Sequence, residues 1–462
     1  MLQPSPSATT RRIWQQHRPR IEAMFSELWA QPEMPAMEYT SMAVLSGFLE
    51  DNGFSVKRGA GGVPTAFVGR KGSRSGPRIG ILAEYDALPC LDNEAVPYRK
   101  GTGRRPGHGC GHNHIGPANT GAGIAAALAL EELGLAGEIV VIGCPAEEIG
   151  WGKLALQDAG VFDGLDVVLT SHGDYQNGSL SRPCHATASG EFRFTGDSAH
   201  SGMGTLRDAL KTAEAAIAAF EALSASLPDL QFKHIFRVAG VAPGVMPEEV
   251  RIWCSVRHLD FDALMAGYDQ MEQTFRRVAE QAGVGFSAHL IAACRGYLGN
   301  DAVGRVLQEA LEVVGPPAWT DDDIAWMTEL GTHSAPGQPF ELHRALEYFD
   351  TGVDYYGQDD GDLSWAVPLG RVNWAYPTTV PIHHWAWTAH SGHKSSSPGP
   401  LMASEALAIA AVELAQNDRA IEAAKAELAQ RIAGQVIAPP LYGAREILTT
   451  DPASFWDASW TA

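Results

Sequence analysis

Apolar runs of strand length alternate with helical patterns over the first two thirds of the chain. Continuous apolar runs are typical of strands buried on both faces of a mostly parallel sheet, and they are predicted at 65–68, 79–83, 138–144 and 166–170. Helices are predicted around them at 14–29, 39–50, 119–132 and 153–158. This alternation predicts an α/β domain.

The pattern changes character near Cys184. Alternating strands and amphipathic helices then follow in the order strand, helix, strand, strand, helix, strand, at 186–195, 207–223, 232–238, 250–258, 264–278 and 284–291. This is the order of a ferredoxin-like α+β unit. We therefore predict an inserted domain over 186–297, which divides the α/β domain into 1–185 and 298–462.

The last third of the chain combines predicted helices with a long irregular region. A helix is predicted at 302–314, two more at 403–415 and 420–432, and an irregular region between them from 316 to 400. Irregular stretches of this length are usually disordered or functional. Five tryptophans between Trp319 and Trp385 favour an ordered, functional region.

Composition narrows the possible partners. The 462 residues include 34 Lys and Arg against 54 Asp and Glu, a formal net charge of −20, which disfavours a nucleic-acid partner. No apolar run approaches the length of about 18 residues that a membrane span needs, and residues 1–13 lack the apolar core of a secretory signal. Six scattered cysteines do not form a disulfide framework. We expect a cytoplasmic protein without membrane or nucleic-acid partners.

A cluster of metal-binding residue types stands directly before a predicted helix. His108-Gly-Cys-Gly-His-Asn-His114 holds three histidines and a thiol within seven residues. Cys110 and His112 are alternate residues of a turn and can face one ion. Thiolate and imidazole suit Zn or Mn–Fe type ions far better than Ca or Mg.

Further candidates follow predicted strands. Glu147 and Glu148 come directly after the strand at 138–144, and His172 ends the next one. Ligands of open α/β sheets bind at the carboxyl ends of strands, so one Glu is a candidate metal ligand and the other a proton shuttle. Four histidines at 383, 384, 390 and 393 offer one further ligand. His200 lies in a polar turn of the inserted domain, from which a hinged lid could bring it over a substrate.

Together these motifs resemble the metal-dependent amidohydrolases that include p-aminobenzoyl-glutamate hydrolase, hippuricase and the auxin-conjugate hydrolases. The resemblance spans nearly the whole chain. It rests on the joint order of Ala-Glu-Tyr-Asp-Ala-Leu-Pro at 83–89, Gly-Cys-Gly-His-Asn at 109–113, Pro-Ala-Glu-Glu at 145–148, His172, Ala-His-Ser-Gly at 199–202, Asp-Gly-Asp-Leu-Ser-Trp at 360–365 and His-His-Trp at 383–385. The second and sixth segments are similar to the aminobenzoyl-glutamate branch in particular.

The resemblance implies a zinc-peptidase-like catalytic domain and an inserted lid that forms a homodimer. By matching position, one or two Mn or Zn ions would be held by Cys110, His112, Glu148, His172 and His383. Glu147 would be the general base for an activated water, and His200 would stabilise an oxyanion, across the dimer. Asp86 and Asp362 would orient ligands through hydrogen bonds. His383 aligns with the family's single His, but the sequence leaves His384 open.

The chain also departs from the family pattern. Ala242 stands where relatives carry an Asn that binds the substrate end. Arg257 could replace that contact, or simply pair with Asp260. His114 adds a polar group where relatives are apolar. The tryptophans predict an aromatic-lined pocket, which makes Trp385 a candidate substrate contact. His114 and Arg257 are candidates for the reasons just given.

Three functions remain open from the sequence. The leading hypothesis is hydrolysis of the amide bond of an N-acyl or N-aroyl amino acid. The alternative is hydrolytic deamination of an aromatic amine on the same metal site, with release of ammonia. The third is a non-catalytic, metal-dependent binding protein, which the Glu147–Glu148 pair disfavours because a binding module needs no spare carboxylate beside its metal.

Overall fold

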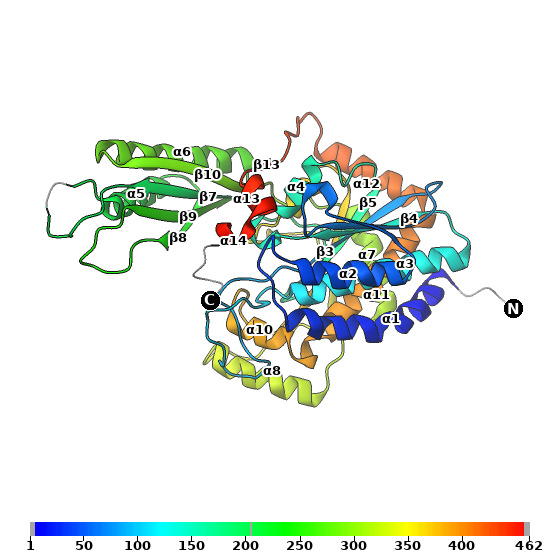
Figure 1. Cartoon of the computed structure of the whole chain (residues 1–462). Coiled ribbons are helices and arrows are strands. Elements are labelled where there is room, and N and C mark those ends of the chain that lie inside the picture. The colour runs from blue at the N-terminus through cyan, green and yellow to red at the C-terminus, as the bar shows by residue number, and fades with distance from the viewer. Residues whose placement is uncertain (1–4, 204–205, 457–462) are drawn as a thin grey trace.

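Two sheets organise the molecule. The computed structural model describes residues 5–203 and 206–456. A larger body surrounds an eight-stranded sheet, and a smaller, elongated body with a five-stranded sheet projects from one side of it (Figure 1). This arrangement confirms the predicted α/β domain with an inserted α+β unit.

The central sheet has the strand order β1-β2-β4-β3-β5-β12-β6-β11. Its middle strands β4, β3, β5 and β12 run parallel, whereas β1, β2 and β6 pair antiparallel with their inner neighbours. The strands are β1 (Ser55–Arg58), β2 (Phe67–Gly72), β3 (Arg78–Glu84), β4 (Glu138–Cys144), β5 (Val167–Asp174), β6 (Asn177–Leu180), β11 (Leu346–Phe349) and β12 (Leu369–Ala375). The parallel strands are apolar because helices and loops cover both of their faces.

Two apolar clusters sandwich this sheet. Helices α1, α2, α3, α7 and α11 supply one cluster, and α4 supplies part of the other. The helices of this body are α1 (Pro6–Trp29), α2 (Tyr39–Asp51), α3 (His112–Leu133), α4 (Gly152–Asp158), α7 (Asp301–Val314), α8 (Asp321–Ser334), α9 (Asp360–Ser364), α10 (Trp385–Ser391), α11 (Pro398–Gln416), α12 (Asp418–Arg431), α13 (Arg445–Thr450) and α14 (Pro452–Phe455), with short 3-10 turns η1 (Ala60–Gly62), η2 (Glu147–Ile149) and η3 (Lys394–Ser396).

The prediction of an irregular region from 316 to 400 is wrong. This region contains α8, β11, α9, β12 and α10. Helix α8 begins with a capping box between Thr320 and Asp323. Strand β12 is buried throughout, but Arg371 and Asn373 interrupt its apolar pattern, and their partners lie on other segments of the chain. The capping box could have predicted the start of α8 from the sequence, whereas β12 depends on contacts with distant segments.

The inserted unit has its own core. Its strands are β7 (Ala186–Thr195), β8 (Gln231–Val238), β9 (Glu249–His258) and β10 (Gly285–Cys294), and its helices are α5 (Ala209–Ser224) and α6 (Phe261–Gln281). The spatial order β10-β7-β9-β8 is that of a ferredoxin-like sheet, with both helices packed on one face. The strand β13 (Leu441–Tyr442) extends this sheet beside β10, so the C-terminal segment is not confined to the larger body as the predicted division at 298–462 has it.

No helix of the described residues is long and apolar enough to cross a bilayer. The six cysteines are all free thiols, as their scattered positions predicted.

Candidate metal centre and active-site cavity

The Gly-Cys-Gly-His turn places two candidate ligands at the start of a buried helix. His112 is the first residue of α3, which begins seven residues before the predicted start at 119. Gly111 has a φ of 81°, and a Cβ there would lie 3.1 Å from the indole nitrogen of Trp387. The helical pattern is hidden here because three polar residues open the helix and are buried like the apolar residues that follow.

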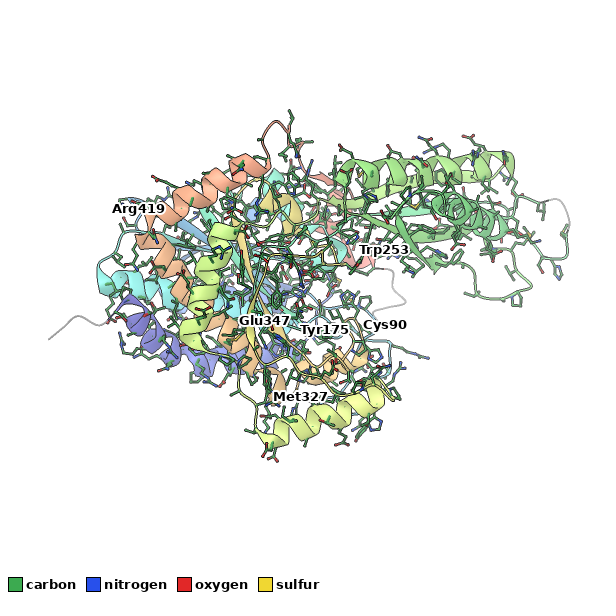
Figure 2. The ribbon with its side chains drawn as sticks, turned by 180° about the vertical axis from the view of Figure 1, so that it is seen from behind. Cys90, Tyr175, Trp253, Met327, Glu347 and Arg419 are labelled. Atoms are coloured by element: carbon green, nitrogen blue, oxygen red, sulfur yellow. The ribbon has the colours of Figure 1, made fainter. Side chains whose placement is uncertain are left out.

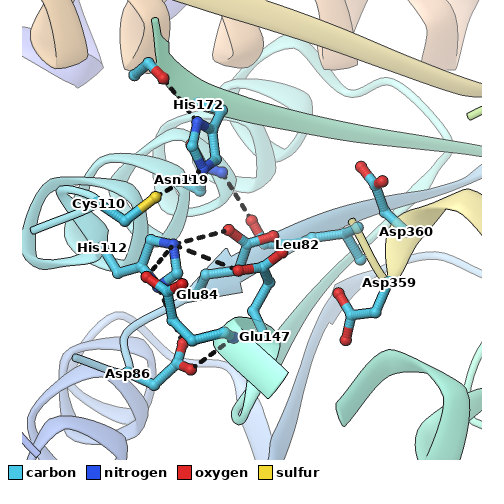
Figure 3. A network of polar contacts seen from close by, with 12 residues as sticks. Leu82, Glu84, Asp86, Cys110, His112, Asn119, Glu147, His172, Asp359 and Asp360 are labelled. Atoms are coloured by element: carbon cyan, nitrogen blue, oxygen red, sulfur yellow. Dashed lines mark hydrogen bonds and ion pairs between the residues drawn. The ribbon is translucent and has the colours of Figure 1, made fainter. Parts of the chain in front are cut away.

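Asp86 connects this helix to the glutamate pair. Its Oδ1 lies 2.9 Å from Nδ1 of His112, and its Oδ2 accepts a hydrogen bond of 2.9 Å from the backbone N–H of Glu148 (Figure 3). The first contact leaves Nε2 of His112 directed at the site, the usual arrangement for a metal-binding histidine. The structure thus brings Asp86 to the position expected for a residue that orients ligands.

The turn that carries Glu147 and Glu148 is held from outside. Ala146 has a φ of 57°, a left-handed conformation that is rare for residues other than glycine. Its backbone N–H donates a 2.8 Å hydrogen bond to the buried carboxyl group of Glu38, which also accepts from the N–H of Ala36 at 2.8 Å. Glu38 therefore fixes the direction in which the glutamate pair leaves β4.

The candidate ligands meet at the carboxyl ends of β3, β4 and β5. Nε2 of His172 lies 3.5 Å from Sγ of Cys110, and Nε2 of His383 lies 3.3 Å from Oε2 of Glu148. Donor atoms within 4.8 Å of one another form three groups: Cys110 with His112 and His172, Cys110 with Glu148 and His383, and Glu84 with His112 and Glu147. Cys110 belongs to two of these groups.

The chemistry of this cluster fits a divalent cation. Nε2 of His112, Oε2 of Glu84 and Oε1 of Glu148 are buried and have no hydrogen-bond partner among the described residues. Burial raises the pKa of Glu148 to about 8 and that of the Cys110 thiol above its usual range, and it lowers the pKa of His172 to about 4. Buried polar atoms without partners destabilise the fold, and one bound cation could contact several of these atoms together.

The structure distinguishes the two neighbouring histidines. The backbone N–H of His383 donates to the carbonyl of Gly109 at 3.0 Å, which fastens it to the cysteine turn, and its φ of 56° directs it to Glu148. His384 instead caps α10, where its Nδ1 accepts from the N–H of Ala386. Geometry therefore favours His383 as the ligand.

The site also contains a buried lysine that the sequence did not predict. Nζ of Lys153 lies 2.8 Å from Oε1 of Glu84 and pairs with Asp359, and all three side chains are buried. Glu84 in turn lies 3.8 Å from Nε2 of His112. The sequence could have indicated Glu84 as a site residue, because it ends β3 beside the end of β4. Nothing in the sequence near Lys153 indicated its role.

Two of the predicted residues do not meet the cluster within this chain. Asp362 accepts a hydrogen bond of 2.6 Å from the backbone N–H of Arg295 and pairs with the Arg295 guanidinium, so the contacts of its carboxylate are with Arg295 and not with a candidate ligand. His200 is exposed in a loop of the inserted unit, where it bridges to Val245. Its expected role needs a second copy of the chain.

The structure places His114 and Trp385, the other two expected substrate contacts, outside the cavity lining. Both ring nitrogens of the buried His114 are occupied, by the hydroxyl groups of Tyr376 at 2.9 Å and Ser396 at 3.1 Å. Trp385 packs against the apolar core beside His384 and does not line the cavity. The same holds for the other tryptophans that predicted an aromatic pocket, at 319, 326, 365, 374 and 387.

A cavity of about 800 Å³ opens between the cluster and the inserted sheet. One wall carries Glu147 and four of the candidate ligands, Cys110, Glu148, His172 and His383, whereas His112 is fully buried. The other consists of side chains on the face of the inserted sheet that its helices leave open, namely Thr187, Ser189, Lys233, Trp253, Ser255 and Arg257. Arg257 donates to the carbonyl of Tyr355 at 3.2 Å, and Asp260 caps α6 instead of pairing with it. Arg257 is thus the one predicted substrate contact that the structure places in the cavity.

Comparison with known proteins agrees with this architecture. Residues 80–423 match the model of peptidase family M20/M25/M40. The chain belongs to this family. As a member of peptidase family M20/M25/M40 it is a hydrolase that acts on C–N bonds. The match covers part of each segment of the larger body and the inserted unit from β7 to β10.

Similar sequences include two components of p-aminobenzoyl-glutamate hydrolase from Escherichia coli. One is 26% identical over 86% of this chain and 89% of its own length. The other is 29% identical over 66% of this chain and 75% of its own length. Among solved structures, the aminobenzoyl-glutamate utilization protein from Klebsiella pneumoniae has a TM-score of 0.59 at 16% identity and covers 87% of this chain and 98% of its own. These similarities confirm the resemblance to the aminobenzoyl-glutamate branch.

Proposed function

We propose that this protein hydrolyses the amide bond of an N-acyl or N-aroyl amino acid, with Cys110, His112, Glu148, His172 and His383 as ligands of divalent metal, Mn or Zn. The observation that carries the proposal is the convergence of these donors and Glu147 in one cluster, which lines the cavity through all of them except the fully buried His112. Cys110 belongs to two donor groups, so the cluster would offer ligands for two ions. A solved Bacillus subtilis relative, TM-score 0.56 at 18% identity, is described as a dinuclear metal-binding peptidase.

The chain's own residues divide the work of the reaction. Bound divalent metal would supply Lewis-acid activation of water and of the amide carbonyl. Glu147 takes the proton from the attacking water and returns it to the leaving nitrogen. Burial, with Glu84 close by, raises the pKa of Glu147 well above its usual range, which lets this carboxylate hold and return a proton. Asp86 keeps His112 and the turn of Glu148 in place.

The inserted sheet supplies the substrate's anchoring groups. Lys233 and Arg257 are the cationic side chains of the described residues that line the cavity. We assign them to the carboxylate of the amino-acid half, in place of the Asn that Ala242 has replaced. A carboxylate and a guanidinium form strong, charge-assisted hydrogen bonds.

The proposed active form is a homodimer through the inserted unit. Strand β8 is the outer strand of its sheet and exposes Ile235 by 56% and Phe236 by 37%. Exposed apolar edge strands readily pair with another chain, and pairing here would carry His200 toward the second protomer. Phe236→Lys, at a position that does not line the cavity, should yield a monomer in light scattering with a kcat at least tenfold lower. A fully active monomer would contradict this assembly.

Product identification tests the reaction. Protein loaded with Mn or Zn is incubated with p-aminobenzoyl-glutamate, benzoyl-glycine, N-acetyl amino acids and free aminobenzoates, with Glu147→Gln as the matched blank. Acid plus amino acid, released only by the unsubstituted protein, is the expected result. Release of ammonia from an aminobenzoate would instead establish an aromatic amine hydrolase. Tight binding of these amides without Glu147-dependent turnover would favour a binding protein.

A further inference from the structure

The C-terminal strap, Leu441–Trp456, lies between the two bodies of the molecule, where α13 and α14 appear in red (Figure 1). It begins beyond residue 423, the end of the family match. The strap therefore lies outside the part of the chain that the family model matches.

One end of the strap joins the inserted sheet. Strand β13 pairs with β10 through Leu441 and Tyr442, and the N–H of Gly443 donates to the carbonyl of Ile291 at 2.9 Å. A Cβ on Gly443 would lie 2.0 Å from the carbonyl oxygen of Leu290. Only glycine allows the strap to approach the sheet this closely.

The rest of the strap is fastened to the catalytic body. The indole N–H of Trp151 donates to the carbonyl of Gly443 at 2.8 Å, and the indole N–H of Trp456 donates to the carbonyl of Pro35 at 2.8 Å. Arg445 reaches the carbonyl of Gly61, also at 2.8 Å. Trp151 follows the glutamate pair by three residues, so the strap touches the segment that carries the proposed general base.

The strap also surrounds a side chain of the cavity wall. Trp253, at the junction of the two bodies in Figure 2, lines the cavity from β9. Its ring lies 5.7 Å from Phe455, at 79°, and 5.9 Å from Trp456. The guanidinium of Arg237 stands 5.4 Å from the Trp253 ring and 5.0 Å from the Phe455 ring, and Glu191 pairs with it at 2.7 Å. Trp253 is thus held by residues of the inserted unit and of the strap.

We propose that the C-terminal strap locks the inserted unit against the catalytic body and presents Trp253 as the aromatic wall that receives the aryl half of an aroyl amino acid. The substrate class rests on the proposed amide hydrolysis; the lock does not. Aromatic rings prefer edge-on or offset contacts with one another, and a ring that is already fixed binds a flat group without first being ordered. The catalytic cluster and Trp253 stand on opposite walls of the cavity, so the angle of the inserted unit determines their separation.

Kinetics of three variants test the wall. Trp253→Leu should raise KM for p-aminobenzoyl-glutamate about tenfold, the size of one aromatic contact, and leave KM for N-acetyl-glutamate within about twofold. Phe455→Ala should shift the same ratio in the same direction. The control is Phe286→Leu, on the helix-covered face of the same sheet, where Phe286 stacks on Phe192. Equal KM changes for both substrates, or the same selectivity change in the control, would refute the wall.

Hydrogen exchange of the whole chain tests the lock without any turnover. Trp456→Ala should speed exchange at least tenfold in peptides that cover β10 and residues 146–151, and leave the buried helix α11 unchanged. Unchanged exchange in β10 and 146–151 would overturn the lock. If the unsubstituted protein cleaves no amide, the proposed function and the aromatic wall fail together, whereas the exchange result still decides the lock.

Discussion

Glu38 offers the sharpest quantitative test of how the site is built. Its carboxyl group is fully buried, and its Oε1 accepts the backbone N–H groups of Ala36 and Ala146 at 2.8 Å each. Burial, with the nearby charge of Asp86, raises the pKa of Glu38 from 4.5 to about 8. The folded protein therefore holds this carboxyl group protonated at a pH where the unfolded chain ionises it.

The sign of the pH effect follows from proton linkage. The unfolded chain releases this proton above about pH 4.5, and the folded protein releases it only near pH 8. Stability that the neutral carboxyl group contributes is therefore fully present below pH 4.5 and is lost as the pH rises toward 8. At about 1.4 kcal/mol for each pH unit, the loss is on the order of 5 kcal/mol.

Glu38→Gln isolates this contribution, because glutamine keeps the accepting oxygen and cannot ionise. Chemical denaturation of both proteins is measured from pH 5 to pH 8.5. The free energy of unfolding of the unsubstituted protein should fall relative to Glu38→Gln by several kcal/mol and then level off. Parallel curves over this range would show that the carboxyl group is not held neutral, and would refute the reasoning.

Glu38→Ala tests the link to the glutamate turn. Two buried N–H groups would lose their acceptor, at a cost of about 1–3 kcal/mol each, and Ala146 would lose the contact that holds its left-handed conformation. We expect a kcat at least tenfold lower. Glu33→Ala is the matched control, since Glu33 accepts from the N–H groups of Thr40 and Ser41 but does not touch the turn. An equal fall in kcat in both variants would contradict the link.

Three further predictions concern the cluster. His383→Ala should lower bound metal and should lower kcat at least a hundredfold, whereas His384→Ala should lose only a helix cap of about 1 kcal/mol. Metal analysis and steady-state kinetics distinguish the two variants, and equal effects would contradict the assignment of His383 as the ligand. Cys110→Ser should retain less metal after dialysis than His172→Ala, because Cys110 belongs to two of the three donor groups and His172 to one; equal retention would argue against a shared ligand. Lys153→Met should lower the free energy of unfolding in urea by about 3–5 kcal/mol, because it leaves two buried carboxylates without a cation. An unchanged free energy of unfolding would show that these carboxylates are already protonated.

The sequence was most informative where chemistry is local. Cys110 and His112 are two residues apart in a glycine-rich turn, and Glu147 and Glu148 directly follow an apolar strand, so both pairs could be found without the fold. That they face one another depends on the parallel pairing of β3 with β4 and β5, which is also a readable pattern. Glu84 belonged to the same pattern and required only that it be applied to the end of β3.

Contacts between distant segments could not be read in this way. His114 resembles a ligand by its spacing, but the helix that starts at His112 turns it toward Tyr376, whose hydroxyl group occupies its ring. Trp385 stands near His383 in sequence and still packs into the core. Glu38 reaches Ala146 and Lys153 reaches Asp359, each more than a hundred residues away, and no local pattern predicts such contacts.

The acidic motif near residue 360, which supports the family resemblance, forms buried ion pairs. Each of its three carboxylates pairs with a different buried cation: Asp359 with Lys153, Asp360 with Arg371, and Asp362 with Arg295. Lys153 supports Glu84 beside the cluster, and Arg371 lies within the central sheet. Arg295 follows the last residue of β10, where the chain returns from the inserted unit, and the Asp362 carboxylate holds both its backbone N–H and its guanidinium. Because a broken buried ion pair costs about 3–5 kcal/mol, this short motif fixes the return of the chain to the same platform on which the cluster rests.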